Sequence, residues 1–403
     1  MTNIKLRALI TICFIAILIV SACSPVSRTS TPSPWEQRGQ TTATGATTID
    51  ATTITPAQNS FNDNAPPVTV ALLLPLSGAQ ATLGQSMLQG AQMALFEMGY
   101  TNFNLMPRDT GGTASGATSA ANSAIQDGAG PILGPLFADS VRAVKPIARA
   151  SNINIIAFST DWSLADNSTF LMGFMPFTQV ERISRFALSK GYKNFALIAG
   201  QDKYGDAVTD EFSDIVSRNG GGIAHAIRFN AQDNISSKIA DLKEHNFNAV
   251  FMPVGGGQSD NISSALSNNA LLPSQVKRIG TGLWDDPRIA AQPSMEGAWF
   301  AAPSPAARRA FEQKYSDTFG GQPARLATLA YDATALAANL AQTGFQSARG
   351  PAFNTRDITN SNGFAGTDGV FRFKSNGLIE RNLSVLEFRN GAIVESDRSR
   401  SRF

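Results

Sequence analysis

The chain has 403 residues, enough for two or three domains, and 43% of them are hydrophobic, so most of the chain can build a buried core. Its 33 basic and 31 acidic residues give a formal charge of only +2, which argues against nucleic acid as a partner. Two cysteines and two histidines supply almost no ligands for a Cys/His metal site and too few thiols for a disulfide scaffold.

The first residues have the pattern of an export signal. Lys5 and Arg7 precede an uncharged, largely apolar run over residues 8–22, which is shorter than the roughly 20 residues that a membrane-spanning helix needs. The sequence Val20-Ser21-Ala22-Cys23 at its end resembles the lipobox of bacterial lipoproteins. This resemblance implies cleavage before Cys23, acylation of that cysteine, and a periplasmic protein anchored to a membrane. The serine that follows favours the outer membrane. An ordinary signal peptide with an incidental cysteine is the alternative.

Residues 23–66 read as a tether that starts at the lipidated cysteine. Ser, Thr, Pro, Gln, Asn and Gly dominate the segment, and it offers little periodic apolar burial. A flexible segment of this length spans roughly 35–40 Å. We therefore expect it to hold a folded body clear of the bilayer.

From Pro67 onward, strand patterns alternate with helix patterns. Residues Val68–Leu74 form a continuous aliphatic run typical of a buried parallel strand, and apolar residues at helical spacing follow it. The alternation begins again near residue 177, which predicts a second α/β unit. Two runs near the end, Val370–Lys374 and Ser384–Phe388, are followed by turn signals and predict antiparallel strands.

The predicted fold class is therefore α/β, with two lobes that are each a parallel sheet flanked by helices, and with antiparallel C-terminal strands. Residues 1–22 are predicted to be the signal peptide and residues 23–66 the tether. The first lobe is expected over residues 67–175 plus about 300–345. The second lobe is expected over residues 176–299 plus about 346–403.

Residues 68–395 resemble the type I periplasmic binding proteins of the leucine/isoleucine/valine-binding class. The segments that carry this resemblance are VALLLPLSGAQATLGQSMLQGAQMAL, ILGPLFADSVRAVKPIARASNINIIAFST, DKYGDAVTDEF and GTDGVFRFKSNGLIERNLSVLEFRNGAIV. Within that superfamily, the PLSG opening, the GPLF segment and the long tether look most like the penicillin-binding-protein activator lipoproteins. The resemblance implies the two-lobed type I fold, with crossing segments that join the lobes and a ligand-sized cleft between them.

Loops that follow the strands are expected to line this cleft, because ligands of open α/β sheets bind beyond the carboxyl ends of the strands. By the resemblance, Ala138 stands where the amino-acid binders carry a serine for the ligand carboxylate, with Ser140 nearby. By the same resemblance, the family's hydroxyl pair matches Ser159 and Thr160. Its tyrosine matches Tyr204, and its ammonium-binding acid matches Asp285. The predicted ligand-binding residues are Ser77, Ala138, Ser140, Ser159, Thr160, Tyr204 and Asp285.

Two functions from different classes follow from these observations. The first is capture of a small, amino-acid-like ligand for an ABC importer, whose permease would be the partner. The alternative is an outer-membrane-tethered activator of a peptidoglycan synthase, which the closer resemblance, the long tether and the partly kept ligand residues favour. The chain has no G-x-S-x-G, Walker A or H-E-x-x-H motif, and neither His225 nor His245 has an evident nucleophile or metal partner. We therefore expect a binding protein without cofactor or metal, and no enzyme.

Overall fold

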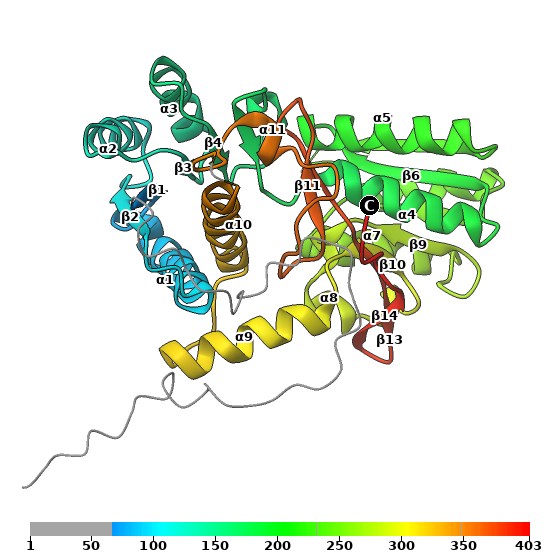
Figure 1. The fold of residues 1–403 in the computed structure, drawn as a ribbon. Helices are drawn as coiled ribbons and strands as arrows, with labels where there is room; N and C mark the ends of the chain where they lie inside the picture. Colours follow the sequence, from blue (N-terminus) through cyan, green and yellow to red (C-terminus); the bar gives the residue numbers. More distant parts are fainter. Residues whose placement is uncertain (1–66, 231, 348) are drawn as a thin grey trace, which may run out of the picture. The chain divides into compact units, whose positions relative to one another are not determined.

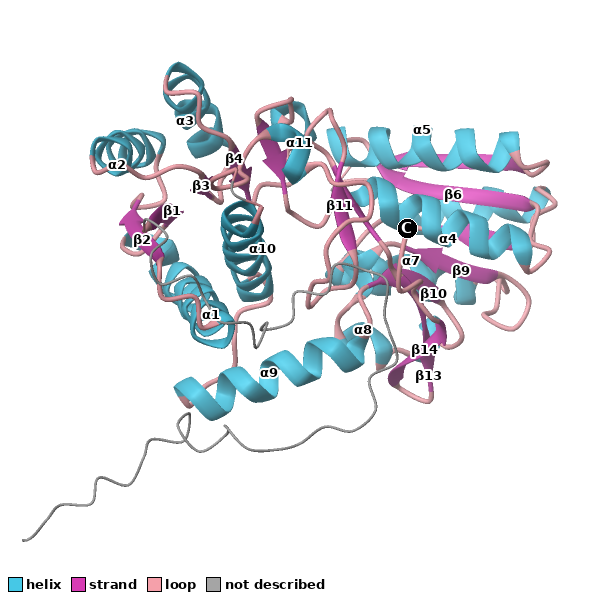
Figure 2. Cartoon of the chain, viewed as in Figure 1, coloured by secondary structure: helices cyan, strands magenta, loops and turns pink. Residues whose placement is uncertain are grey.

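In the computed structural model, two sheets of unequal size organise the described part of the chain, which comprises residues 67–230, 232–347 and 349–403 (Figure 1). The predicted signal peptide, Cys23 and the tether lie outside these residues. Contacts among the described residues join both sheets into one compact unit. Figure 2 shows helices on both faces of each sheet.

The first sheet is entirely parallel, in the order β2-β1-β3-β4-β5. Strand β1, which lies between β2 and β3, is buried almost throughout because helices cover both faces, which explains the continuous aliphatic run in the sequence. Helices α1 and α10 pack together, as do α2 and α3 (Figure 1). The elements are β1 (Val68–Leu74), α1 (Ala81–Met98), β2 (Phe103–Asp109), α2 (Ala114–Gln126), β3 (Ile132–Leu133), α3 (Ala138–Ala150), β4 (Ile155–Ala157), β5 (Thr169–Leu171) and α10 (Ala327–Gln346).

The second sheet has the order β14-β13-β10-β9-β8-β6-β7, and only β13 and β14 run antiparallel to their neighbours. Side chains of β6 alternate between two cores: Phe195 and Leu197 face α4 and α5, whereas Ile198 faces α6 and α7. The elements are α4 (Pro176–Ser189), β6 (Asn194–Gly200), α5 (Lys203–Arg218), β7 (Gly222–Phe229), α6 (Ile235–Ala240), β8 (Ala249–Phe251), α7 (Gly256–Asn268), β9 (Lys277–Gly280), α8 (Pro287–Ala290), β10 (Trp299–Ala302), β13 (Ser384–Arg389) and β14 (Ala392–Asp397).

The chain passes between the two sheets at three places, which we name the crossing segments. They are residues 172–175 after β5, residues 303–304 after β10, and residues 382–383 before β13. Between the second and third crossings, α9 (Pro305–Phe319), α11 (Thr355–Ile358) and the two-stranded sheet β11 (Phe371–Phe373) and β12 (Ile379–Arg381) join the first sheet's side. Short 3-10 turns complete the structure: η2 (Gly78–Gln80), η3 (Trp162–Leu164), η4 (Asp241–Glu244), η5 (Gly282–Trp284) and η6 (Pro293–Met295).

The predicted fold class is confirmed: helices flank parallel sheets in two lobes, and antiparallel strands end the chain. The turn signal Asn390-Gly391 joins β13 to β14, and both of its residues have positive φ (53° and 73°), as a tight hairpin turn requires. The run Val370–Lys374 contains β11, whose partner is β12 and not the C-terminal hairpin.

The lobe boundaries stay a prediction, and the packing of the described residues differs from them in two details. Strand β10 lies in the second sheet, whereas Ile358, Phe371 and Ile379 pack in the core of the first. The third crossing therefore comes after β12 and not near residue 346. In the described part of the chain, no helix combines the length and the apolar character that crossing a membrane demands.

Candidate functional site

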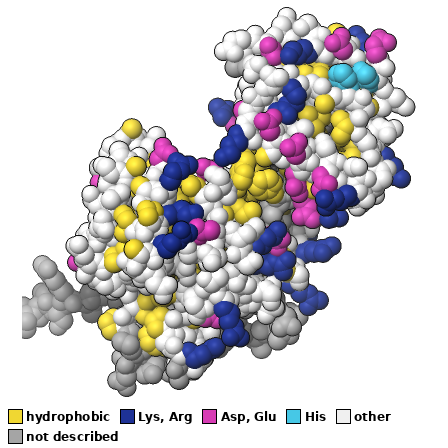
Figure 3. All heavy atoms as spheres, turned by 90° about the horizontal axis from the view of Figure 1, so that it is seen from above, with side chains coloured by type: hydrophobic (Ala, Val, Ile, Leu, Met, Phe, Trp, Pro, Cys, Tyr) yellow, Lys and Arg dark blue, Asp and Glu magenta, His cyan; other side chains and the backbone are white. Residues whose placement is uncertain are grey.

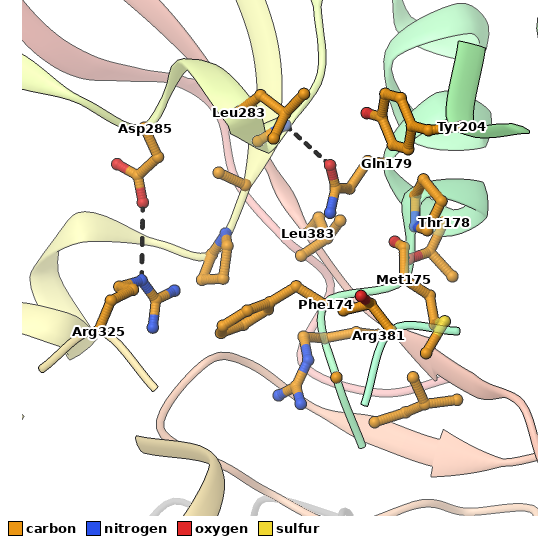
Figure 4. Close-up of a pocket in the computed structure, with 17 residues that line it drawn as sticks. Phe174, Met175, Thr178, Gln179, Tyr204, Leu283, Asp285, Arg325, Arg381 and Leu383 are labelled. Carbon is orange, nitrogen blue, oxygen red and sulfur yellow. Dashed lines mark hydrogen bonds and ion pairs between the residues drawn. The ribbon is translucent and has the colours of Figure 1, made fainter. Parts of the chain in front are cut away.

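All three crossing segments contribute to one cavity of about 280 Å³, which we name the crossing pocket (Figure 4). Its apolar walls come mainly from these segments and from the strands and helices that they join. Phe174 belongs to the first crossing, Pro303 to the second and Leu383 to the third. The polar and charged side chains that line the pocket are Thr160, Thr178, Gln179, Tyr204, Asp285, Arg325 and Arg381.

Three of the predicted ligand-binding residues line the crossing pocket. Thr160 follows β4 of the first sheet, Tyr204 lies in the first turn of α5, and Asp285 follows η5 of the second sheet. Residues from loops of both lobes therefore meet at one cavity, as the resemblance implies. That these side chains contact a ligand remains a prediction.

The other four predicted residues do not line this pocket. Ser77 and Ser159 take part in local hydrogen bonds, whereas the buried hydroxyl of Ser140 has no hydrogen-bond partner among the described residues. The backbone N–H of Ser77 donates to Asp109 Oδ1 at 3.1 Å, and a hydrogen bond from the Ser77 side chain lowers the pKa of Asp109. Ser159 is buried, and its Oγ accepts from the Asp161 N–H at 3.1 Å. Ser140 is buried in the first turn of α3, two residues after the half-buried Ala138.

Two polar side chains of the pocket hold the second lobe's loops in place. Tyr204 and Thr281 share a hydrogen bond of 3.0 Å between their hydroxyl oxygens, and burial raises the pKa of Tyr204 to about 12, so the phenol stays neutral. Gln179 Oε1 accepts from the N–H of Gly282 at 2.8 Å, which ties α4 to η5. Figure 4 shows the amide nitrogen of Gln179 on the pocket side of this bond.

Asp285 links the second sheet to helix α9. Its Oδ2 forms a short ion pair with Arg308, and the Arg325 Nε lies 4.0 Å from the same oxygen. The Asp285 side chain is only 9% exposed, and its Oδ1 has no hydrogen-bond partner among the described residues. One oxygen of this carboxylate is therefore engaged, and the other is buried without a partner among the described residues.

Two further arginine–aspartate contacts lie beside the crossing pocket. Arg325 binds the fully buried Asp368 with both terminal nitrogens, at 2.8 and 3.3 Å, and its guanidinium carbon lies 4.3 Å from the centre of the Phe174 ring. Arg381 Nη1 lies 3.7 Å from Asp332 Oδ2, and both side chains are almost fully buried. Burial raises the pKa of Asp332 to about 6.

Four further residues line the pocket and were not predicted from the sequence: Phe174, Gln179, Arg325 and Arg381. A signal for one of them was present. Residues 379 and 381 share one face of a strand, and Ile379 indicates that this face is buried, so an arginine at 381 points inward. A charged side chain that is buried in this way requires an opposite charge or hydrogen-bonding groups beside it.

The two histidines pack against each other and away from the crossing pocket. The rings of His225 and His245 stack with their centres 4.1 Å apart, and they lie together at the surface (Figure 3). In residues 67–230, 232–347 and 349–403, no group of three or more His, Cys, Asp or Glu side chains is arranged to hold a metal ion.

Comparison with known proteins gives a family match and distant structural matches. The family model described as periplasmic binding protein matches residues 67–392. An uncharacterised protein from Rickettsia prowazekii is 23% identical over 158 residues, which cover 39% of this chain and 42% of that protein's length.

Solved structures are similar at the level of the fold. A branched-chain amino acid transporter substrate binding protein from Streptococcus pneumoniae, in complex with isoleucine, has a TM-score of 0.58 at 19% identity and covers 83% of this chain and 100% of its own. A solute binding protein of an ABC transporter from Rhodopseudomonas palustris, in complex with 3,4-dihydroxy benzoic acid, has a TM-score of 0.59 at 19% identity and covers 84% and 97%.

Replacement of the Asp332 carboxyl by an amide in Asp332→Asn changes how stability depends on pH. The folded state holds the Asp332 proton up to about pH 6, whereas an ordinary aspartate releases it near pH 3.8. Stability that the wild type has below pH 4 is therefore lost as the pH rises through 6. Relative to the variant, we expect its free energy of unfolding to fall by about 2–3 kcal/mol between pH 4 and pH 7.5. Urea unfolding measures this difference, and an equal difference at both pH values contradicts the prediction.

Proposed function

The chain belongs to the periplasmic binding protein family, and from this premise we propose that it captures a small, amino-acid-like ligand in the crossing pocket for an ABC-type importer. The observation that carries the proposal is the pocket itself. Apolar side chains from three crossing segments surround a few convergent polar groups, an arrangement typical of small-molecule sites.

The size and chemistry of the pocket support a ligand of amino-acid dimensions. A cavity of about 280 Å³ is just below the usual range for ligand sites, so it suits only a small ligand. The wall contains a cation, Arg381, and an acid, Asp285, one oxygen of which has no partner among the described residues, with apolar surface between the polar groups. The structural relatives were solved with isoleucine and with 3,4-dihydroxy benzoic acid, which are both small carboxylic acids.

We propose binding without catalysis at this site. Tyr204 stays protonated because burial raises the pKa of its phenol to about 12, and it is already hydrogen-bonded to Thr281. Asp285 is paired with Arg308. A nucleophile or general base needs a free, activated group, and neither side chain provides one.

The anchoring of the protein is also a proposal. The charged start, the apolar run and Cys23 support a periplasmic lipoprotein, with the outer membrane favoured. Regulation of a peptidoglycan synthase remains the alternative function, since the sequence resemblance that suggested it is independent of the crossing pocket.

We expect removal of the pocket's hydroxyl groups to weaken ligand binding. Isoleucine and 3,4-dihydroxybenzoate serve as probes, and a probe at 100 times its dissociation constant adds about 2.7 kcal/mol of stability to the wild type in a thermal-shift assay. We expect Thr160→Ala and Tyr204→Phe each to weaken binding about tenfold, because each removes a hydrogen-bonding group from the wall.

Ser77→Ala is the matched control, since Ser77 lies outside the pocket and its replacement leaves the affinity unchanged. Equal losses in Ser77→Ala and in the pocket variants, or no stabilisation by either probe, contradict the proposal.

In-cell crosslinking separates the two candidate partners. Wild-type protein, crosslinked in envelope membranes and purified, is expected to recover the permease subunits of an importer. Cys23→Ser is expected to lose acyl labelling and to leave the membrane fraction, or to keep its signal peptide. Recovery of a peptidoglycan synthase without importer subunits contradicts the transport proposal and supports the alternative.

A further inference from the structure

Arg381 occupies an unusual position for an arginine. It is the last residue of β12, directly before the third crossing segment, and its side chain is only 3% exposed. It nevertheless forms part of the wall of the crossing pocket, and Figure 4 shows its guanidinium beside the Phe174 ring.

None of the three guanidinium nitrogens of Arg381 has a hydrogen-bond acceptor among the described residues. The nearest carboxylate oxygen, Asp332 Oδ2, is 3.7 Å away, beyond the distance of a hydrogen bond. The rings of Phe174 and Phe371 flank the guanidinium carbon at 5.6 and 5.1 Å and hold it by cation–π contact. A buried guanidinium without acceptors carries a large desolvation cost, so its position calls for an anionic partner.

The other arginine of the pocket and one oxygen of its aspartate are already engaged. Arg325 directs its terminal nitrogens to Asp368 and Thr328, and Asp285 Oδ2 binds Arg308. Arg381 is therefore the cation of this pocket that retains unused donors, as far as the described residues show.

We infer that Arg381 binds the carboxylate of the ligand, so that the end of β12, next to the third crossing segment, and not the first lobe's strand-end loops, recognises the charged end. The inference rests on the proposed solute-binding function. Two neighbouring N–H groups of a guanidinium match the two oxygens of a carboxylate, which suits this group better than a neutral amide. The ligand class is a small carboxylic acid whose apolar body lies against Phe174 and the apolar residues around it.

A purely structural role for Arg381, as the counter-charge of Asp332, makes a different prediction, and paired variants separate the two roles. Arg381→Gln alone leaves Asp332 buried without a cation and can fail to fold. Arg381→Gln combined with Asp332→Asn removes both charges, so that neither substitution leaves the other side chain as an unpaired buried charge. Asp332→Asn alone keeps Arg381 and is the matched control.

The experiment compares acids with amides of nearly the same shape. The probes are 3,4-dihydroxybenzoate against 3,4-dihydroxybenzamide, and L-isoleucine against L-isoleucinamide, with dissociation constants measured by calorimetry on the mature full-length chain. We expect the wild type and Asp332→Asn to prefer at least one acid over its amide by tenfold or more. In the double variant, we expect this preference to fall to less than twofold, with amide binding unchanged.

The outcomes that overturn the inference differ from those that overturn the proposed function. A preference for the acid that persists in the folded double variant, or that Asp332→Asn alone abolishes, removes Arg381 as the carboxylate-binding group. Equal binding of acid and amide by the wild type overturns the inference and leaves solute binding intact. Failure of every probe to bind the wild type counts against solute binding itself, and the inference falls with it.

Discussion

A network of buried or half-buried ionic groups lies where the chain crosses between its two sheets, and the geometry of the candidate site depends on it. Charges removed from water are stable only when opposite charges lie close by, so each member restricts where the others can be. The network draws on the loop after η5, the start of α9, α10 and its preceding loop, the loop before β11, and β12. Its members are Asp285, Arg308, Arg325, Asp332, Asp368 and Arg381.

This network positions the walls of the crossing pocket. Arg325 and Arg381 both lie against the ring of Phe174, within 4.3 and 5.6 Å of its centre, and so fix the first crossing segment beside the third. The ion pair between Asp285 and Arg308 joins a loop of the second sheet to the helix that follows the second crossing. The segments that connect the two lobes thereby also form the cavity between their loops.

The fold was predictable because its signal is local. A buried parallel strand needs a short aliphatic run, and a covering helix needs apolar residues at regular spacing, so β1 and α1 can be recognised within about thirty residues. Three of the pocket residues could be predicted for a related reason, since Thr160, Tyr204 and Asp285 each follow or end a loop at the carboxyl end of a strand.

The remaining pocket residues could not be predicted from the sequence, because only the tertiary structure brings them into contact. The first crossing segment contains Phe174, the loop before α10 contains Arg325, and β12 ends at Arg381. These positions are far apart in the sequence, and no spacing within one segment predicts their contact. Conversely, Ser77 and Ser140 occupy strand-end positions of the expected kind but do not line the crossing pocket. Position in a loop places a residue near the cleft, whereas side-chain packing decides which cavity it lines.

The claim that the crossing segments form the ligand site is tested most directly by a crystal structure of the mature protein with 3,4-dihydroxybenzoate or isoleucine bound. We expect electron density for the probe in the crossing pocket, enclosed by Thr160, Phe174, Tyr204 and Leu283, with the carboxylate in hydrogen-bond contact with Arg381. Density for the probe beside Ser77 or Ser140, with the crossing pocket filled only by solvent, would contradict it.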